Sequence, residues 1–211
     1  MRRGKFFVLE GIDGSGKSYQ TTEFTHRLKN AGVDAIATEE PWLDDSIGAM
    51  INRALFDKKE ATDVRTLQLL YIANRSNHLH RLIEPAINSG KTVVCSRYWM
   101  STAVYGGMFS HDPYFDMKHF VMINERFLRP DAVFFISLKP EEAFRRLAKQ
   151  RRLTDRFEKL ESIKSQAEGY AELEKIYKYK GVWININGNQ EKAKVTDELM
   201  RNYGRIENFI A

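Results

Sequence analysis

The chain has few of the features that mark exported or membrane-bound proteins. Its 211 residues include one cysteine, Cys95, so no disulfide can form within the chain, and a reducing cytoplasm is the expected location. No apolar run approaches the roughly 20 residues that a membrane-spanning helix requires. The chain passes from Met1-Arg2-Arg3 directly into the apolar run 6–9, which is far shorter than the core of a signal peptide. We therefore expect a cytoplasmic protein with no membrane association.

Repeats, linkers and low-complexity tracts are also missing from the sequence. A chain of 211 residues is long enough for one well-buried α/β domain and too short for two. We therefore expect a single domain over residues 1–211. Cys95 follows Val93 and Val94 in an apolar run, so we expect it to be a buried packing residue and not a nucleophile.

The formal net charge of +5 suits an anionic partner. Nucleic acids and free nucleotides are equally anionic, so charge alone does not separate them. Binding to single strands would need a basic stripe with interleaved aromatic residues, and the basic cluster that stands out is confined to residues 151–156. We expect small-molecule nucleotides as partners and no nucleic acid.

Short apolar runs alternate with longer segments of helical periodicity, which indicates βαβ units and a largely parallel sheet. The expected strands are 6–9, 33–38, 91–95, 133–138 and 182–186, and the expected helices are 17–30, 47–55, 64–89, one that opens at 139–142 and one from about 190. The sequence therefore predicts an α/β fold of three layers, α/β/α, around a central, mostly parallel five-stranded sheet.

A glycine-rich segment lies between the first expected strand and the first expected helix. It fits the pattern G-x-x-x-x-G-K-[ST] of a phosphate-binding loop (P-loop). Glycines let the backbone curl so that successive N–H groups face phosphate oxygens, and the helix N-terminus adds its positive dipole end. The candidate nucleotide-binding residues are Gly11, Asp13, Gly14, Ser15, Gly16, Lys17 and Ser18.

Within this loop, two side chains have distinct expected roles. Lys17 should reach the β- and γ-phosphates of ATP, and the hydroxyl of Ser18 should bind Mg²⁺. Many P-loop motor proteins and helicases hold the metal with an aspartate at the end of an apolar strand. Here the strands 91–95 and 133–138 place Ser96 and Ser137 at that point, which argues against a motor or helicase.

Six stretches of the chain, in the same order and over nearly its whole length, resemble segments of the thymidylate kinase family. They are Leu9–Ser18, Glu40-Pro41, Leu69–Arg75 with His78, Arg97-Tyr98, Ser101 with Tyr105, and Arg151–Glu158. The resemblance implies a P-loop kinase fold with an arginine-bearing lid, ATP as phosphoryl donor, Mg²⁺ and a homodimer formed through long helices.

The resemblance also implies roles in binding the acceptor nucleotide. In that family, the residue at the position of Asp13 contacts the sugar 3′-hydroxyl, and those at Tyr71 and Arg75 stack on and hydrogen-bond the thymine. Tyr71 and Arg75 are four residues apart, so both leave one face of a helix. Arg97 matches the arginine that holds the acceptor phosphate, and Tyr105 the aromatic that closes on the sugar.

A lid over about residues 145–160 would cover the donor phosphates. The phosphate loop carries no arginine, so the chain resembles those members of the family whose lid supplies the positive charge for the transition state. The resemblance implies Arg151 and Arg156 as candidate catalytic residues, together with Lys17 and Arg97.

Next to the lid, two arginines each follow a glutamate by four residues. Arg145 follows Glu141, and Arg146 follows Glu142, so we expect solvated ion pairs on a helix.

Four residues depart from the family pattern. Glu39 stands in place of an arginine, Gly106 in place of a glutamine, and Ser96 and Ser137 in place of aspartates. A carboxylate at position 39 would repel the acceptor phosphate, and a serine at position 96 removes a group from the outer shell of the metal. We therefore expect weak activity with a raised KM for the acceptor, and the departures leave the base preference open.

The expected function is ATP-dependent phosphorylation of a deoxynucleoside monophosphate, dTMP to dTDP. Three alternatives remain: a deoxynucleoside kinase on the same scaffold, a nucleoside monophosphate kinase of altered base specificity, and a catalytically weak nucleotide-binding relative.

Overall fold

The computed structural model describes residues 3–56, 62–110, 112, 114–149, 159–177 and 183–210. The strands are β1 (Phe6–Glu10), β2 (Ala35–Glu39), β3 (Thr92–Ser96), β4 (Ala132–Ser137) and β5 (Trp183–Asn187). The helices are α1 (Lys17–Asn30), α2 (Ser46–Phe56), α3 (Val64–His78), the π-helical turn η1 (Leu79–Ile83), α4 (Glu84–Asn88), α5 (Trp99–Phe109), α6 (Met117–Asn124), α7 (Pro140–Lys149), α8 (Leu160–Tyr177) and α9 (Lys192–Ile210).

The five strands form one sheet in the order β2-β3-β1-β4-β5, and every pairing is parallel. Leu9 of the central strand pairs with Ser96 on one side and with Phe134 on the other. All five residues of β1 are buried, because helices cover both faces of the sheet. The predicted three-layer α/β fold with a five-stranded sheet is confirmed.

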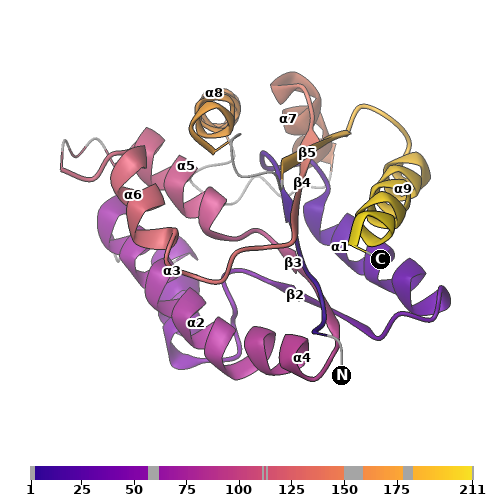
Figure 1. Cartoon of the computed structure of the whole chain (residues 1–211). Helices are drawn as coiled ribbons and strands as arrows, with labels where there is room; N and C mark the ends of the chain where they lie inside the picture. The colour runs from indigo at the N-terminus through magenta and orange to yellow at the C-terminus, as the bar shows by residue number, and fades with distance from the viewer. Residues whose placement is uncertain are drawn as a thin grey trace.

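The two faces of the sheet carry separate cores (Figure 1). On the face covered by α1 and α9, Phe7, Phe24 and Phe134 pack ring against ring, with centroids 5.7 to 6.2 Å apart. On the other face, α5, α6 and α8 pack over alternate strand residues such as Val8 and Cys95. Cys95 is fully buried, as predicted, and burial raises the pKa of its thiol well above the ordinary value.

The helices differ from the sequence prediction in two ways: one expected helix is divided, and α5, α6 and α8 lie outside the expected helices. The expected helix 64–89 is continuous in direction but is built from α3, the π-helical turn η1 and α4. The sequence does not predict α5, because its own apolar residues are distributed over all its faces and show no amphipathic period. It packs between α3, α6 and α8. In the described part of the chain, no helix has the length and apolar character to cross a membrane.

Candidate active site

The phosphate loop joins the carboxyl end of β1 to the start of α1. Gly14 and Gly16 have φ of +79° and +95°, which residues with a Cβ rarely adopt. A Cβ on Gly14 would also lie 2.5 Å from the carbonyl oxygen of Ala143 in α7. The backbone conformation therefore requires both glycines, and the close approach of α7 is a second requirement at Gly14.

Lys17 is held inside the loop. Its side chain is 5% exposed, and Nζ donates hydrogen bonds to the carbonyl oxygens of Gly11 and Ile12, at 2.8 and 2.9 Å. Burial and the nearby charge of Arg97 lower the pKa of Lys17 to about 7. A phosphate anion beside this amine would favour its charged form.

A cavity of about 610 Å³ opens over the loop, and α7 and the start of α9 line its other walls. Its basic side chains suit a polyanion such as the triphosphate of ATP; they are Lys17, Arg97, Arg145, Arg146, Lys149 and Lys192. We call it the donor cavity.

Two of these arginines form ion pairs in a different pattern from the one expected. Arg146 pairs with Glu142 as predicted, at 2.8 Å, but Arg145 pairs with Glu142 at 2.7 Å and not with Glu141, since residues three apart on a helix are also neighbours. The sequence interpretation of these arginines as a solvated pair missed their place in the wall of the donor cavity.

Asp13 connects the phosphate loop to α5 and α8. Its carboxylate accepts hydrogen bonds from Arg97, from Tyr105 Oη at 2.6 Å and from Gln166 Nε2 at 2.9 Å. Burial alone would raise the pKa of Asp13, but Arg97 and Lys17 outweigh it and lower the pKa, so the group is ionised. Gln166 also accepts from the Asp13 backbone N–H at 2.9 Å, a contact between residues 153 positions apart.

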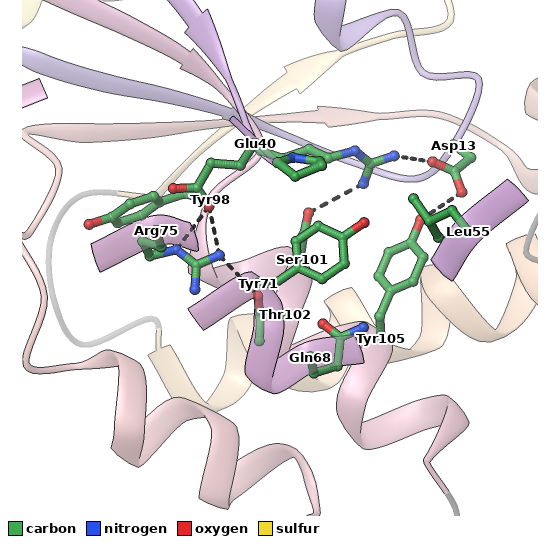
Figure 2. A pocket seen from close by; sticks show the side chains of 12 residues that line it. Asp13, Glu40, Leu55, Gln68, Tyr71, Arg75, Tyr98, Ser101, Thr102 and Tyr105 are labelled. Atoms are coloured by element: carbon green, nitrogen blue, oxygen red, sulfur yellow. Dashed lines mark hydrogen bonds and ion pairs between the residues drawn. The ribbon is translucent and has the colours of Figure 1, made fainter. Parts of the chain in front are cut away.

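A second cavity, of about 210 Å³, lies next to the donor cavity on the side of α3 and α5, and we call it the acceptor cavity (Figure 2). The structure brings all five expected acceptor-binding residues to its wall: Asp13, Tyr71, Arg75, Arg97 and Tyr105. Asp13 and Arg97 line both cavities, so the two spaces meet at these side chains.

Arg75 is 1% exposed and is held by three side chains. Glu40 Oε2 accepts from Nε and Nη2 at 2.8 and 2.6 Å, and Thr102 Oγ1 accepts from Nη2 (Figure 2). Asn124 Oδ1 accepts from Nη1 at 2.6 Å. At least four of the five N–H groups of the guanidinium are thus directed by the protein. Sequence reasoning missed Thr102 and Asn124, which reach this site from α5 and α6.

Glu10, at the end of β1, is a buried carboxylate that fixes the start of α5. It accepts hydrogen bonds from the backbone N–H of Tyr98 at 2.8 Å, from the N–H and hydroxyl of Ser101, and from Tyr170 Oη at 2.7 Å. Negative charge is favourable at a helix N-terminus, so this contact stabilises the helix that carries Ser101 and Tyr105. A glutamate that directly follows an apolar strand was the available sequence signal.

The four residues that depart from the family pattern lie in three different places in the structure. Glu39 and Ser96 line neither cavity but a third one beside Ser18. A Cβ on Gly106 would lie 2.2 Å from the ring of Phe120, so the close packing of α5 on α6 requires the glycine. Ser137 lies outside the donor and acceptor cavities, at the exposed end of β4. Arg151 and Arg156 lie outside the described residues.

Comparisons with known proteins find one family. The family model "Thymidylate kinase" matches residues 9–199. A thymidylate kinase of Desulfotalea psychrophila is 35% identical over 161 residues, 76% of this chain and 77% of that protein. One from Caldicellulosiruptor saccharolyticus is 33% identical over 206 residues, 94% and 98% of the two chains. The solved structure of thymidylate kinase from Candida albicans is similar in fold, with a TM-score of 0.81, 21% identity and coverage of 98% of this chain and 93% of that one.

Proposed function

The chain belongs to the thymidylate kinase family, and from this we propose that it transfers the γ-phosphoryl group of ATP to dTMP, giving dTDP and ADP. The observation that carries the proposal is the meeting of the two cavities at Asp13 and Arg97. A donor γ-phosphate in one cavity and an acceptor phosphate in the other would face each other there. Such proximity is most of what phosphoryl transfer requires from the protein.

On the donor side, the loop N–H groups, Lys17 and the arginines of α7 would bind the triphosphate. Ser15 Oγ is buried and makes no hydrogen bond to any described residue, as expected of a hydroxyl whose partner is a ligand. The lid arginines, Arg151 and Arg156, would add positive charge around the transferring group.

Mg²⁺ fits the donor side. The described residues contain no group of three metal-binding side chains, but Mg²⁺ retains several waters and relies on substrate phosphates, so it needs only one or two protein oxygens. The exposed hydroxyl of Ser18, at the start of α1, is one such oxygen. When bound, the metal neutralises charge on the β- and γ-phosphates.

On the acceptor side, the base would stack on Tyr71 while an N–H of Arg75 donates to a thymine carbonyl. Glu40 holds that guanidinium in place, so the acceptor does not have to order it. Arg97 would bind the acceptor phosphate, with Tyr105 and Asp13 beside the sugar. No general base is assigned, because the phosphate oxygen is already a nucleophile and positioning dominates.

The test is ADP release from ATP in the presence of dTMP, dUMP, dCMP, dAMP, dGMP and thymidine. We expect dTMP to be the best acceptor and Lys17→Ala to abolish turnover without lowering the melting temperature. Efficient phosphorylation of thymidine, with none of dTMP, would instead assign the chain to the deoxynucleoside kinases. Lys17→Ala turnover near that of wild type would remove the phosphate loop from the chemistry.

We also propose that the protein is a cytoplasmic homodimer. Three large apolar side chains are exposed on α2 and α3: Met50, Phe56 and Leu69, at 47%, 54% and 42%. Such a surface is typical of an interface between subunits. Analytical ultracentrifugation would distinguish a dimer from a monomer.

A further inference from the structure

A third cavity, of about 580 Å³, lies at the carboxyl ends of β2 and β3, beside the start of α1. Ser18 lines both this cavity and the donor cavity, so the two adjoin at the residue expected to bind Mg²⁺. We call it the β2–β3 cavity. Its walls are Ser18, Thr21, Thr22, Ala37, Thr38, Glu39, Pro41, Trp42, Leu43, Asp44, Leu82 and Ser96.

The register of the sheet places Glu39 next to Ser96 on the face that carries α1. The two residues are direct partners in the parallel pairing of β2 with β3. Ala35 and Val94, in the same strands, pack against α1 in one core cluster. Because side chains alternate along a strand, Glu39 and Ser96 face that same side, and they line one cavity with Ser18 and Thr21 of the first turns of α1.

The composition of the β2–β3 cavity suits a cation. Among the residues that the structure describes, no lysine or arginine lines it, whereas two carboxylates, Glu39 and Asp44, and five hydroxyl groups do. The donor cavity next to it has the opposite character, with several basic side chains. Oxygen ligands of this kind are those that Mg²⁺ prefers.

An unsatisfied buried hydroxyl supports the same conclusion. Thr21, one turn into α1, is 3% exposed, and its Oγ1 has no hydrogen-bond partner among the described residues. A buried hydroxyl that has no protein partner is expected to bond to a water or to an ion. It lies in the wall of the β2–β3 cavity, one helical turn from Ser18.

We propose that Glu39 supplies the carboxylate of the Mg²⁺ site that Ser96 lacks. Glu39 is the direct neighbour of Ser96 in the sheet, and both line the same cavity as Ser18, so the carboxylate of Glu39 faces the space beside the expected metal from the next strand. It would hold waters of the Mg²⁺ bound at Ser18, since Mg²⁺ keeps several of its waters. This inference rests on the proposed function.

Two consequences follow for the departures at positions 39 and 96. The two departures form one rearrangement, in which the carboxylate stands on β2 and not on β3. The arginine that the family has at position 39 would repel a cation held there. Glu39 does not line the acceptor cavity, so its carboxylate does not face the acceptor phosphate directly, contrary to the expectation from the sequence.

The experiment measures ADP affinity by calorimetry with Mg²⁺ and with EDTA, and the ratio of the two affinities is the contribution of the metal. In Glu39→Gln we expect this ratio to fall by about 10-fold or more, the usual loss for removing an outer-shell partner, with ADP affinity in EDTA unchanged. Electron paramagnetic resonance of Mn²⁺ in the ADP complex should show the same loss of metal affinity.

Two further variants control for charge and for fold. Asp34→Asn removes an exposed carboxylate just before β2, at the opposite end of that strand, and should leave the ratio at the wild-type value. Ser96→Asp, added to Glu39→Gln, returns a carboxylate to the neighbouring strand and should restore the ratio. Melting temperatures of all variants would show that the fold is retained, and Glu39→Ala provides a second test of the same loss.

The inference would be overturned if Glu39→Gln and Glu39→Ala had the same ratio of ADP affinities, with Mg²⁺ over with EDTA, as wild type. The proposed function would remain intact, provided that ADP still binds in EDTA. Tighter ADP binding by Glu39→Gln with and without metal would also overturn the inference, because Glu39 would then only repel phosphates. Failure of wild type to bind ADP under either condition would refute the phosphate-loop assignment itself.

Discussion

The buried amine of Lys17 leads to a prediction about protons. In the free protein its pKa is about 7, because burial and Arg97 disfavour the charged form. At pH 8 about 0.9 of the molecules would then carry a neutral Lys17, and at pH 6 about 0.1. Bound phosphates favour the ammonium, so nucleotide binding should be accompanied by proton uptake.

The assay is calorimetry of ADP binding at pH 8 in buffers of different ionisation enthalpy. The dependence of the observed enthalpy on the buffer gives the number of protons bound, which should be about 0.9 per ADP at pH 8 and about 0.1 at pH 6, once the titration of ADP itself is subtracted. Lys17→Arg is the matched control, because a guanidinium stays charged throughout this range, so its binding should take up no proton at position 17.

A binding enthalpy that is the same in all buffers at pH 8 would refute this reasoning. Lys17 would then be charged in the free protein, and its two carbonyl contacts would be sufficient to hold a buried ammonium. Equal proton uptake by wild type and Lys17→Arg would assign the proton to another group.

Three further changes test the packing and the acceptor site. Glu40→Gln should lower the free energy of unfolding in urea by about 3–5 kcal/mol, because it leaves a buried guanidinium without its carboxylate, whereas Glu39→Gln, at an exposed position, should not. Tyr71→Ala should weaken dTMP binding by roughly 1–3 kcal/mol through lost stacking and leave ATP affinity unchanged; equal losses for both ligands would contradict the assignment. Gly106→Gln, which restores the family residue, should lower the melting temperature because of contact with the ring of Phe120, and adding Phe120→Ala should recover part of the loss.

The sequence predicts those parts of the site that depend on local chain geometry. The phosphate loop is one continuous segment whose glycines meet a backbone requirement, and Tyr71 and Arg75 share a helix face by their spacing alone. The fold class followed from apolar runs that are buried on both faces of a parallel sheet.

The remaining features depend on contacts between distant segments. Asn124 holds Arg75 from 49 positions away, and Gln166 holds Asp13 from 153 positions away, so neither partner is visible in a local pattern. The place of Glu39 depends on the register of β2 against β3, which a sequence does not specify by itself.

Three basic side chains of the two substrate cavities already have polar partners in the free protein. Arg75 is paired with Glu40, Arg97 with Asp13, and the amine of Lys17 with two carbonyl oxygens. Because these partners fix each donor in position, a nucleotide would not have to order them on binding. Among these partners, Asp13 lines both the acceptor and the donor cavity. Its hydrogen bond from Gln166 also connects it to α8, which directly follows the segment expected to form the lid. An acceptor phosphate that bound Arg97 would compete with Asp13 for the guanidinium, and would thereby act on the same carboxylate that α8 contacts. This connection predicts that dTMP and ATP bind cooperatively to wild type. In Gln166→Ala we expect the cooperativity to be lost, while the affinity for each nucleotide alone stays at the wild-type value.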